Sequence, residues 1–372
     1  MRAALHMILS WVAALVAGAL VLAFLLGYST AYLPPEQFWW TGPLGVALPY
    51  VSVVVGVMAL GLGGWGLTQA RWAFVAATAV VLLLIALRFG PRLAALTKPA
   101  ALAGDLRVMT FNAPLRGPTP TAAAEGVDRA VAAAAPDILA LQEPVVARYS
   151  TRNPDLVTMS AHLGALAQRE VYQPPELPPP PVRIEQPILG RLPLSNLEVF
   201  AFSFSEGVQA PTHVTRARFR WQEREATIIN LHLHTVSAQK PWLDGGFNLL
   251  SLASWRRYAG QYREATLRRA KEARRIRGLI EEVSGPLLVV GDFNSTPHNW
   301  AYRHIANGLH DAIAVGGRGL SGTYPSAFPL VRIDHILASP EWTIVAAHVA
   351  TEYAYSDHRP VIAQLRWRAA DP

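Results

Sequence analysis

The sequence predicts an α/β domain built around a sheet core, preceded by about three transmembrane helices. The chain has 372 residues, 51% of them hydrophobic, and its three longest apolar runs all lie before residue 90. From about residue 105 onward, short β-type runs alternate with helical segments over roughly 260 residues, which is typical of a single α/β domain. We therefore expect a membrane region at 1–98, a linker at 99–105 and a folded domain at 106–368.

The apolar runs have the length that a helix needs to cross a bilayer. The first, from Met7 to Leu26, is uninterrupted and has about the 20 residues that span the hydrocarbon core. The second contains Pro49 and several glycines, which membrane helices tolerate. The third is flanked by Arg71 and Arg88, whose long side chains can reach the headgroup region. Reading the first run as a cleavable signal peptide is disfavoured, since no small-residue cleavage site follows it. Spans are expected at about residues 7–28, 45–67 and 71–88.

Basic residues around the spans indicate an orientation. Arg2 precedes the first span, the connector after that span has no Lys or Arg, and Arg71 precedes the third. The positive-inside rule then puts the amino terminus inside, and an odd number of spans puts the large domain outside. Three basic residues after the third span favour the opposite orientation, although long domains translocate largely regardless of such charges: Arg88, Arg92 and Lys98. We expect a multi-pass protein of the plasma (inner) membrane with an extracytoplasmic domain.

Charge and cysteine content narrow the chemistry. The net charge of +7 and the pI of about 9.8 allow nucleic acid, anionic lipid or another phosphate-bearing substrate, and select none of them. The chain has no cysteine, which excludes a disulfide framework, a thiolate nucleophile and a Cys-ligated zinc site. The oligomeric state stays undetermined.

The large domain divides into recognisable strands and helices. Eight β-branched or alternating runs predict strands: "DLRVMTFN" (105–112), "DILALQE" (137–143), "THVTRARFRW" (212–221), "ATIINLHLH" (226–234), "PLLVVGDFN" (286–294), "VRIDHILAS" (331–339), "TIVAAHVATEY" (343–353) and "PVIAQLRW" (360–367). Three segments predict helices, at 121–135, 156–167 and 261–283. The Pro-rich stretch at 173–187 predicts an extended surface loop.

Polar side chains stand at the ends of several of these strands. They are Asn112, Glu143, Asn230, His232, Asp292, Asn294 and Asp334, and Asp357 with His358 form a turn before the last strand. If these ends share one edge of a sheet, they form an oxygen-rich cluster that suits Mg²⁺ or Mn²⁺. The imidazoles can do acid and base work there. A metal, a base and amide donors together are what attack of water on a phosphate requires.

An ordered series of short motifs carries a family resemblance. "TFN", "LQE", "LGRLPL", "NLHL", "GDFNSTP", "RIDHIL" and "SDHRPV" occur in this order from about Leu106 to Trp367. The series resembles the DNase I-like endonuclease/exonuclease/phosphatase superfamily. The resemblance implies a four-layer α/β/β/α sandwich, in which two packed sheets are flanked by helices and the site lies at one end. It does not extend to the membrane spans.

The resemblance also implies roles for individual residues. Glu143 would be the principal metal ligand, with Asn112 and Asp357 beside it, and the metal would be Mg²⁺ or Mn²⁺.

By the same resemblance, a second group of residues would act on the substrate. His358 would be the general base, held by Asp334. The remaining residues would position the attacking water, bind the phosphate or assist the leaving group: Asp292, Asn294, His232 and Asn230.

Two further histidines lie next to these motifs. His335 stands where the family commonly has an aromatic residue, and strand alternation points it to the face opposite Asp334, so we interpret it as a packing residue. His234 shares a face with His232, and it is open whether it supports the site or is solvated.

The segment between His234 and the long helix is longer than the connection needs. It presents apolar side chains followed by many basic ones, which suits contact with the bilayer or a lipid tail: Trp242, Phe247, Leu249, Leu250, Leu252 and Trp255. The alternative is an ordinary amphipathic helix with a solvated basic face.

The sequence thus predicts a membrane-tethered, divalent-metal-dependent phosphohydrolase, a phosphodiesterase or a phosphatase. Its substrate would be a lipid-linked or other surface phosphate, because the spans hold the site near lipid headgroups. The alternative is a membrane-anchored nuclease acting on DNA or RNA, for which the high pI is suitable. An inactive binding module is disfavoured, since every metal and base position carries a competent side chain.

Overall fold

The computed structural model describes residues 2–89, 104–113, 120–143, 170–171, 186–204, 212–236, 248, 250–317, 321–353 and 355–368. The helix expected at 156–167 lies outside these residues. Most of the expected linker, most of the Pro-rich loop and most of the apolar segment after His234 lie outside them as well.

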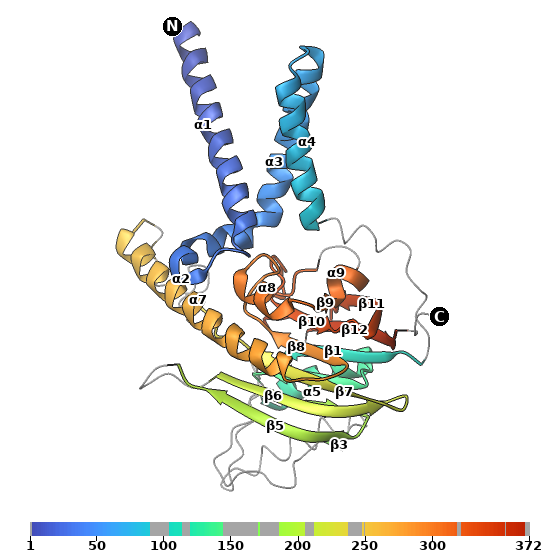
Figure 1. Cartoon of the computed structure of the whole chain (residues 1–372). Coiled ribbons are helices and arrows are strands. Elements are labelled where there is room, and N and C mark those ends of the chain that lie inside the picture. Colours follow the sequence, from blue (N-terminus) through green and yellow to red (C-terminus); the bar gives the residue numbers. More distant parts are fainter. Residues whose placement is uncertain are drawn as a thin grey trace.

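Three long apolar helices form the amino-terminal part of the described chain (Figure 1). They are α1 (Arg2–Ser29), α3 (Gly42–Thr68) and α4 (Trp72–Phe89), with the short α2 (Pro35–Phe38) and the 3-10 turn η1 (Trp39–Thr41) between the first two. All three are long and apolar enough to cross a membrane, by length and composition. Their apolar side chains are largely exposed, which is the pattern of a lipid-facing surface rather than of a water-soluble bundle.

Two six-stranded sheets make up the domain that follows. In the first sheet the strand order is β11-β12-β1-β2-β4-β3, and in the second it is β5-β6-β7-β8-β10-β9. The strands of the first sheet are β1 (Leu106–Asn112), β2 (Ile138–Gln142), β3 (Glu170–Val171), β4 (Ile188–Gly190), β11 (Trp342–Val349) and β12 (Val361–Trp367). Those of the second are β5 (Leu194–Phe202), β6 (Thr212–Trp221), β7 (Arg224–His232), β8 (Leu287–Asp292), β9 (His310–Asp311) and β10 (Asp334–Ala338).

The sheets pack face to face around one apolar core. Val108 and Ile138 of the first sheet belong to the same buried cluster as Ile228 and Leu288 of the second. Strand alternation then turns Met109 and its neighbours to the opposite face. The central strands are buried on both faces, and burial of that kind is the main stabilising contribution in a domain of this size.

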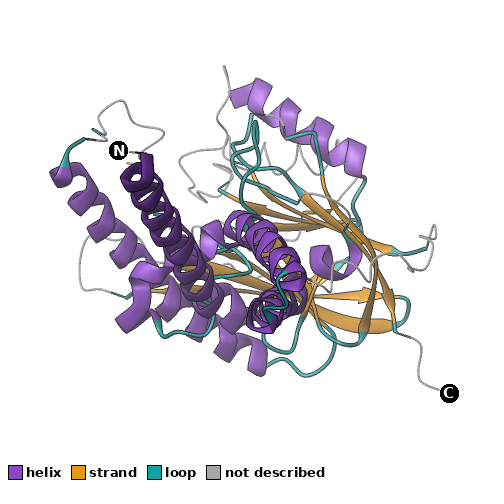
Figure 2. Cartoon of the chain, turned by 90° about the horizontal axis from the view of Figure 1, so that it is seen from above, coloured by secondary structure: helices purple, strands orange, loops and turns teal. Residues whose placement is uncertain are grey.

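Helices cover both outer faces of the two sheets (Figure 2). The first sheet packs against α5 (Pro120–Ala134) through Val127 and Val131. The second packs against α7 (Leu252–Glu281) and α8 (Trp300–Ala306), with Ile276 and Ile305 in the shared cluster. The short α9 (Ala312–Gly316) lies against β11. The domain is therefore the four-layer α/β/β/α sandwich that the family resemblance implies.

Strand register brings polar residues to one edge of the sandwich. In the first sheet β1 and β2 run parallel and both end at this edge, with Asn112 opposite Gln142. In the second sheet β7 and β8 run parallel with His232 opposite Asp292, and the antiparallel β10 begins with Asp334 opposite Asp292. Residues far apart in the sequence therefore meet where the two sheets end.

The base of the three amino-terminal helices packs directly on the domain. The side chain of Asn299, at the start of α8, donates a hydrogen bond to the carbonyl of Gly42 at 3.1 Å. Arg274 of α7 pairs with Glu36 of α2 at 2.6 Å. The amino-terminal helices and the domain are thus joined by side-chain contacts as well as by the chain.

Candidate active site

A glycine with an unusual backbone conformation near the end of β8 precedes two of the site residues, Asp292 and Asn294. Gly291 has φ of +138°, and a Cβ at this position would lie 1.9 Å from the carbonyl oxygen of Leu231. Only glycine fits, because the backbone conformation and the close neighbouring strand both exclude a side chain. Beyond this glycine the Asp292 carboxylate accepts a hydrogen bond from the Asn294 backbone N–H at 2.8 Å, and the Asn294 amide donates to the Leu233 carbonyl at 2.9 Å.

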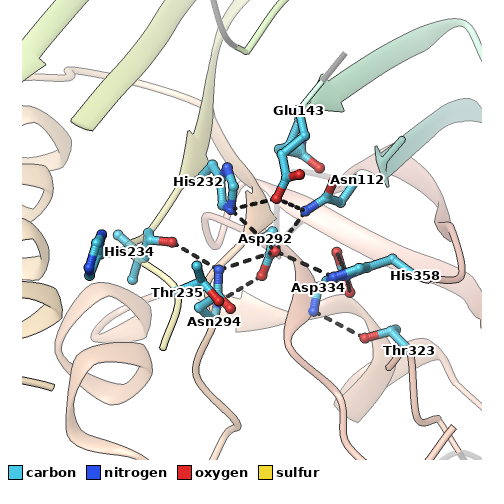
Figure 3. A network of polar contacts seen from close by, with 12 residues as sticks. Asn112, Glu143, His232, His234, Thr235, Asp292, Asn294, Thr323, Asp334 and His358 are labelled. Carbon is cyan, nitrogen blue, oxygen red and sulfur yellow. Dashed lines mark hydrogen bonds and ion pairs between the residues drawn. The ribbon is translucent and has the colours of Figure 1, made fainter. Parts of the chain in front are cut away.

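Asp292 is the centre of the polar cluster (Figure 3). The Asn112 side chain comes from the other sheet and donates to Asp292 Oδ2 at 2.9 Å and to Glu143 Oε1 at 3.3 Å. His232 Nε2 lies 3.5 Å from Asp292 Oδ2 and 3.6 Å from Glu143 Oε1. Asp292 and Asn112 are buried, whereas the Glu143 side chain is 35% exposed. Glu143 therefore stands where the cluster opens outward.

Two buried polar atoms in this cluster have no hydrogen-bond partner among the described residues. They are Asn112 Oδ1 and His232 Nε2. Buried polar atoms are costly when unpaired, and those found in folded proteins commonly serve a ligand or an ion. Both atoms belong to side chains that lie next to the Asp292 carboxylate.

A carboxylate and an imidazole form a buried pair next to Asp292. Asp334 Oδ2 lies 2.9 Å from His358 Nδ1, and His358 Nε2 lies 3.8 Å from Asp292 Oδ2. The Ser356 hydroxyl accepts a hydrogen bond from the His358 backbone N–H and donates one to the Asn112 carbonyl, which fixes this turn to β1.

Electrostatics in the pair favour a protonated imidazole. Burial by itself lowers the pKa of His358, but the carboxylates of Asp334 and Asp292 outweigh it and raise the pKa to about 9. Burial, together with the nearby charge of Asp292, raises the pKa of Asp334. One proton is therefore held between Asp334 Oδ2 and His358 Nδ1 at neutral pH.

The donor set fits a divalent metal ion. Ligand atoms of Asp292, Asp334 and His358 all lie within 4.8 Å of one another. With Glu143 and the unpaired Asn112 Oδ1 at the same edge, the site offers mainly carboxylate and amide oxygens and no sulfur. Oxygen donors of this kind are preferred by Mg²⁺ and Mn²⁺.

The position of Asn230 differs from the expectation that it binds substrate. Its side chain is 0% exposed and donates to the carbonyls of Leu141 (2.9 Å) and Pro187 (3.1 Å), while its Oδ1 accepts from Gln142 Nε2 at 2.6 Å. Asn230 faces the same side as His232 but lies two residues deeper in the strand, below the edge. It ties the two sheets together and is unavailable to substrate. Its hydrogen-bond partner Gln142 was not among the predicted site residues. Its position directly before Glu143, at the end of a predicted strand, could have indicated that it lies near the site.

Asp357 lies beside the cluster rather than within it. Among the described residues, the compact group of possible metal ligands is Asp292, Asp334 and His358. The backbone carbonyl of Asp357 accepts a hydrogen bond from the Ser326 N–H at 2.7 Å. Its carboxylate contributes to raising the pKa of His358.

The two additional histidines lie outside the cluster. His335 is buried among Phe293 and Tyr302, and its ring nitrogens lie 3.1 Å from the Arg332 guanidinium and 3.0 Å from the Ser295 carbonyl. Burial and the Arg332 charge lower its pKa to about 3, so the ring is neutral, and the packing interpretation is correct.

His234 points away from Asp292, toward the helix (Figure 3). Burial and the charges of Arg268 and Arg269 lower its pKa to about 4. Its ring is half-buried and lies apart from Asp292.

Comparisons with known proteins bear on the fold and the family. The family model described as "Endonuclease/Exonuclease/phosphatase family" matches residues 109–358, more than half of the chain. No curated protein matches the chain.

Many solved structures share the fold. An endonuclease/exonuclease/phosphatase family protein from Bacteroides thetaiotaomicron is 16% identical, with a TM-score of 0.53 over 71% of this chain and 98% of that one. A family protein from Leptotrichia buccalis is 13% identical, with a TM-score of 0.50 over 70% of this chain and 100% of that one. A mannosyl-6-phosphatase from Bacteroides thetaiotaomicron is 16% identical, with a TM-score of 0.48 over 70% and 100%.

Proposed function

The chain belongs to the endonuclease/exonuclease/phosphatase family, and from this premise we propose that it is a membrane-tethered, divalent-metal-dependent phosphohydrolase. Hydrolysis of phosphoester bonds is the chemistry of the family. The observation that carries the proposal is that Asn112, Asp292 and the Asp334–His358 pair lie together at one edge of the sandwich. Two buried atoms at this edge, Asn112 Oδ1 and His232 Nε2, have no hydrogen-bond partner among the described residues.

In the proposed mechanism, Glu143, Asn112 Oδ1 and Asp292 would hold the metal. When bound, Mg²⁺ or Mn²⁺ supplies positive charge to the phosphoryl oxygens and to the Asp292 carboxylate. Asp334 is the ion-pair partner that holds the His358 ring through Nδ1. In its neutral form His358 accepts a proton from the attacking water.

The remaining residues orient the reactants. Asn294 is locked by hydrogen bonds to Asp292 and Leu233, so its side chain is preorganised beside the phosphate. His232 stands on the other side of Asp292, where it can bind the phosphate or protonate the leaving group. Asp334 fixes the His358 ring so that Nε2 faces Asp292.

The substrate we propose is a lipid-linked phosphate or phosphodiester. Support comes from the loop before β10, in which Phe328 is 71% exposed and Leu330 is 48% exposed. The carbonyl of Leu330 accepts a hydrogen bond from the hydroxyl of Tyr50 in α3, and the same loop holds Thr323, whose hydroxyl accepts from the Asp334 N–H at 3.3 Å. A loop with two exposed apolar side chains thus connects the candidate span α3 to Asp334 at the start of β10. Such a loop suits a substrate with a lipid tail.

A membrane-anchored nuclease is the second candidate. The pI of about 9.8 and the exposed arginines at the start of α7 favour it: Arg256, Arg257 and Arg263. In either case we propose a multi-pass protein of the plasma (inner) membrane, with a membrane region at 1–98, a linker at 99–105 and an extracytoplasmic catalytic domain at 106–368.

A substrate screen tests the proposal. The purified full-length protein in detergent is incubated with a lipid phosphate, a phospholipid phosphodiester or plasmid DNA, each with Mg²⁺ or with EDTA. We expect hydrolysis of a lipid substrate with Mg²⁺, none with EDTA, and little cleavage of DNA. Efficient DNA cleavage would support the nuclease instead. Failure to hydrolyse any substrate under any metal condition would contradict both.

A further inference from the structure

Two arginines meet at the base of the membrane helices, outside the candidate active site. Arg88 lies in the last turn of α4 and Arg303 lies in α8, and both guanidinium groups face the ring of Tyr32. The Arg88 Cζ atom is 5.8 Å from the Tyr32 ring centroid and the Arg303 Cζ atom is 4.1 Å from it. Arg88 also lies 5.5 Å from the centroid of the Tyr28 ring. We call these four residues the basal arginine cluster.

Within the described part of the chain, neither arginine of the cluster pairs with a carboxylate. Arg88 donates to His298 Nδ1 at 3.1 Å and lies 3.5 Å from the Pro297 carbonyl oxygen, both of which are neutral acceptors. By contrast, Arg274 at the same end of the domain has Glu36 at 2.6 Å. Two cations around one ring repel each other and gain stability from an anion.

The position of the cluster indicates which anion it meets. Tyr28 and Arg88 stand in the last turns of α1 and α4, the ends of two candidate spans that meet above α8 (Figure 1). In a bilayer these helix ends lie at the depth of the headgroups, where Tyr and Arg are favoured and lipid phosphates are concentrated. Arg303 is exposed and Arg88 is half-buried, so a headgroup can reach both.

We propose that Arg88 and Arg303, with the tyrosine rings of the basal arginine cluster, bind the phosphate of an anionic lipid headgroup from the surrounding bilayer. This site is separate from the Asp292 centre, and it rests on the membrane tethering proposed above. Arginine is suited to this role because its planar fork can donate two parallel hydrogen bonds to a phosphate.

The bound lipid has a structural consequence for the active site. Pro297 and His298 follow the turn that carries Asp292 and Asn294, and Arg88 contacts both Pro297 and His298. A headgroup that neutralises the cluster stabilises the contact between α4 and this turn. The lipid therefore strengthens the contact between α4 and the catalytic domain.

Binding to lipids of different charge tests the proposal. The full-length protein, purified in detergent without divalent metal, is titrated with phosphatidylglycerol or phosphatidylcholine, and bound lipid is counted by native mass spectrometry. We expect phosphatidylglycerol to bind about tenfold or more tightly, and the double variant Arg88→Gln/Arg303→Gln to lose this preference. Because Arg88 contacts the domain, Arg303→Gln alone provides a milder test at an exposed position, and Arg303→Lys should retain part of the binding.

Matched controls separate the cluster from general charge effects. Arg274→Gln removes one positive charge at the same end of the domain, but the charge of Arg274 is already neutralised by its partner Glu36. Arg220→Gln removes one positive charge on β6, at a site outside the cluster. Both should retain the preference within about twofold. Free glycerol phosphate at equal concentration should not displace the lipid, because it lacks the acyl chains that keep the lipid in the detergent micelle around the apolar helices.

Several outcomes would overturn the proposal. They are equal binding of the two lipids, an unchanged preference in both Arg303→Gln and the double variant, or displacement by free glycerol phosphate. None of these readouts requires turnover. A protein that prefers phosphatidylglycerol but hydrolyses no substrate would contradict the proposed function and not this inference. A protein that is active but binds the two lipids equally would contradict this inference and not the proposed function.

Discussion

The Asp334–His358 pair is where single residues have the largest expected effect on turnover. Asp334→Asn removes the carboxylate that orients the ring and raises its pKa, so kcat should fall by about 100-fold to 10,000-fold. The limb of the pH–rate profile that reports His358 should also move to lower pH, since an imidazolium without its carboxylate loses its proton more readily. Steady-state kinetics over a range of pH values check both effects.

The exposed Glu341→Gln variant serves as the control for this prediction, because it removes a carboxylate far from the edge where the strands end. Thermal unfolding of both variants establishes that they are folded. Wild-type kcat in a folded Asp334→Asn protein would remove this pair from the proposed mechanism.

Gly291 provides a residue-scale test of the backbone conformation near the end of β8. Gly291→Ala should lower the free energy of unfolding by roughly 2–4 kcal/mol, because φ is +138° and the new Cβ would collide with the Leu231 carbonyl. Gly278→Ala is the matched control: Gly278 lies in α7 with open space around it, and the change should stabilise the protein by about 0.5–1 kcal/mol. Denaturant titration in one detergent compares them, and equal stability of the two variants would contradict the close approach.

Sequence pattern predicted which residue types line the edge but not how deep each one sits. Alternation correctly put His335 on the face opposite Asp334. It could not distinguish Asn230, which is enclosed by the first sheet, from His232, which reaches the edge. That difference depends on the carbonyls of Leu141 and Pro187, which pack over Asn230 from the other sheet. The sequence around Asn230 carries no information about these distant residues.

At the scale of elements, a buried polar network clamps β10 to β9 and α9. Arg332 pairs with both oxygens of Asp311 at 2.8 and 2.9 Å, and Asp311 caps α9 through the Ile313 N–H. The Arg332 charge holds the pKa of Asp311 well below its usual range despite burial, and burial holds His335 neutral with a pKa of about 3. Breaking one member of such a network leaves a buried charge or dipole unpaired.

This network predicts acid sensitivity. Both pKa values lie below their unfolded-state values, so the stabilisation is fully present above pH 6.5 and is lost as the pH falls, first from about 6.5 toward 3 through His335 and then through Asp311. Each group contributes a slope of about 1.4 kcal/mol per pH unit in its range. Unfolding free energies measured between pH 7.5 and pH 4 report it.

His335→Phe separates the network from general acid effects. The variant should be less stable at pH 7.5, because Arg332 and the Ser295 carbonyl lose a partner, yet its stability should fall less steeply between pH 6.5 and 4. His310→Gln changes an exposed histidine on neighbouring β9 and should keep the wild-type slope. An unchanged slope in His335→Phe would exclude this histidine as the source.

Element recognition from sequence depended on how regular the apolar pattern is. The central strands β1, β2, β7 and β8 have strong patterns and were predicted within a few residues. Strand β5 (Leu194–Phe202) was missed, because it lies at the edge of its sheet with many exposed residues and has little alternation. The strand predicted at 343–353 extended too far. In the structure β11 ends at Val349, because Val349 pairs with Val361, the first residue of β12.

At the scale of the whole molecule, the proposed orientation predicts which side of the membrane exposes the catalytic domain. Protease added to intact cells should cleave the domain, because an odd number of spans with the amino terminus inside leaves it outside. Immunoblotting against a carboxyl-terminal tag detects the cleavage, and a cytoplasmic marker protein should stay uncut in the same cells. Cleavage that occurs only after lysis would place the domain on the cytoplasmic side.

By itself, the sequence determined the class of the protein: apolar runs long enough to span a bilayer, a sheet-based domain, and oxygen-rich polar residues at strand ends. These properties follow from local length, period and side-chain chemistry, which neighbouring residues reveal. The tertiary structure alone decided which strand ends meet and that Asn230 is enclosed. It also decided that Asn112 Oδ1 and His232 Nε2 have no hydrogen-bond partner among the described residues, and that Arg88 meets Arg303 at the Tyr32 ring. Such contacts join residues far apart in the chain, and the packing of two sheets and three helices, rather than any local pattern, sets them.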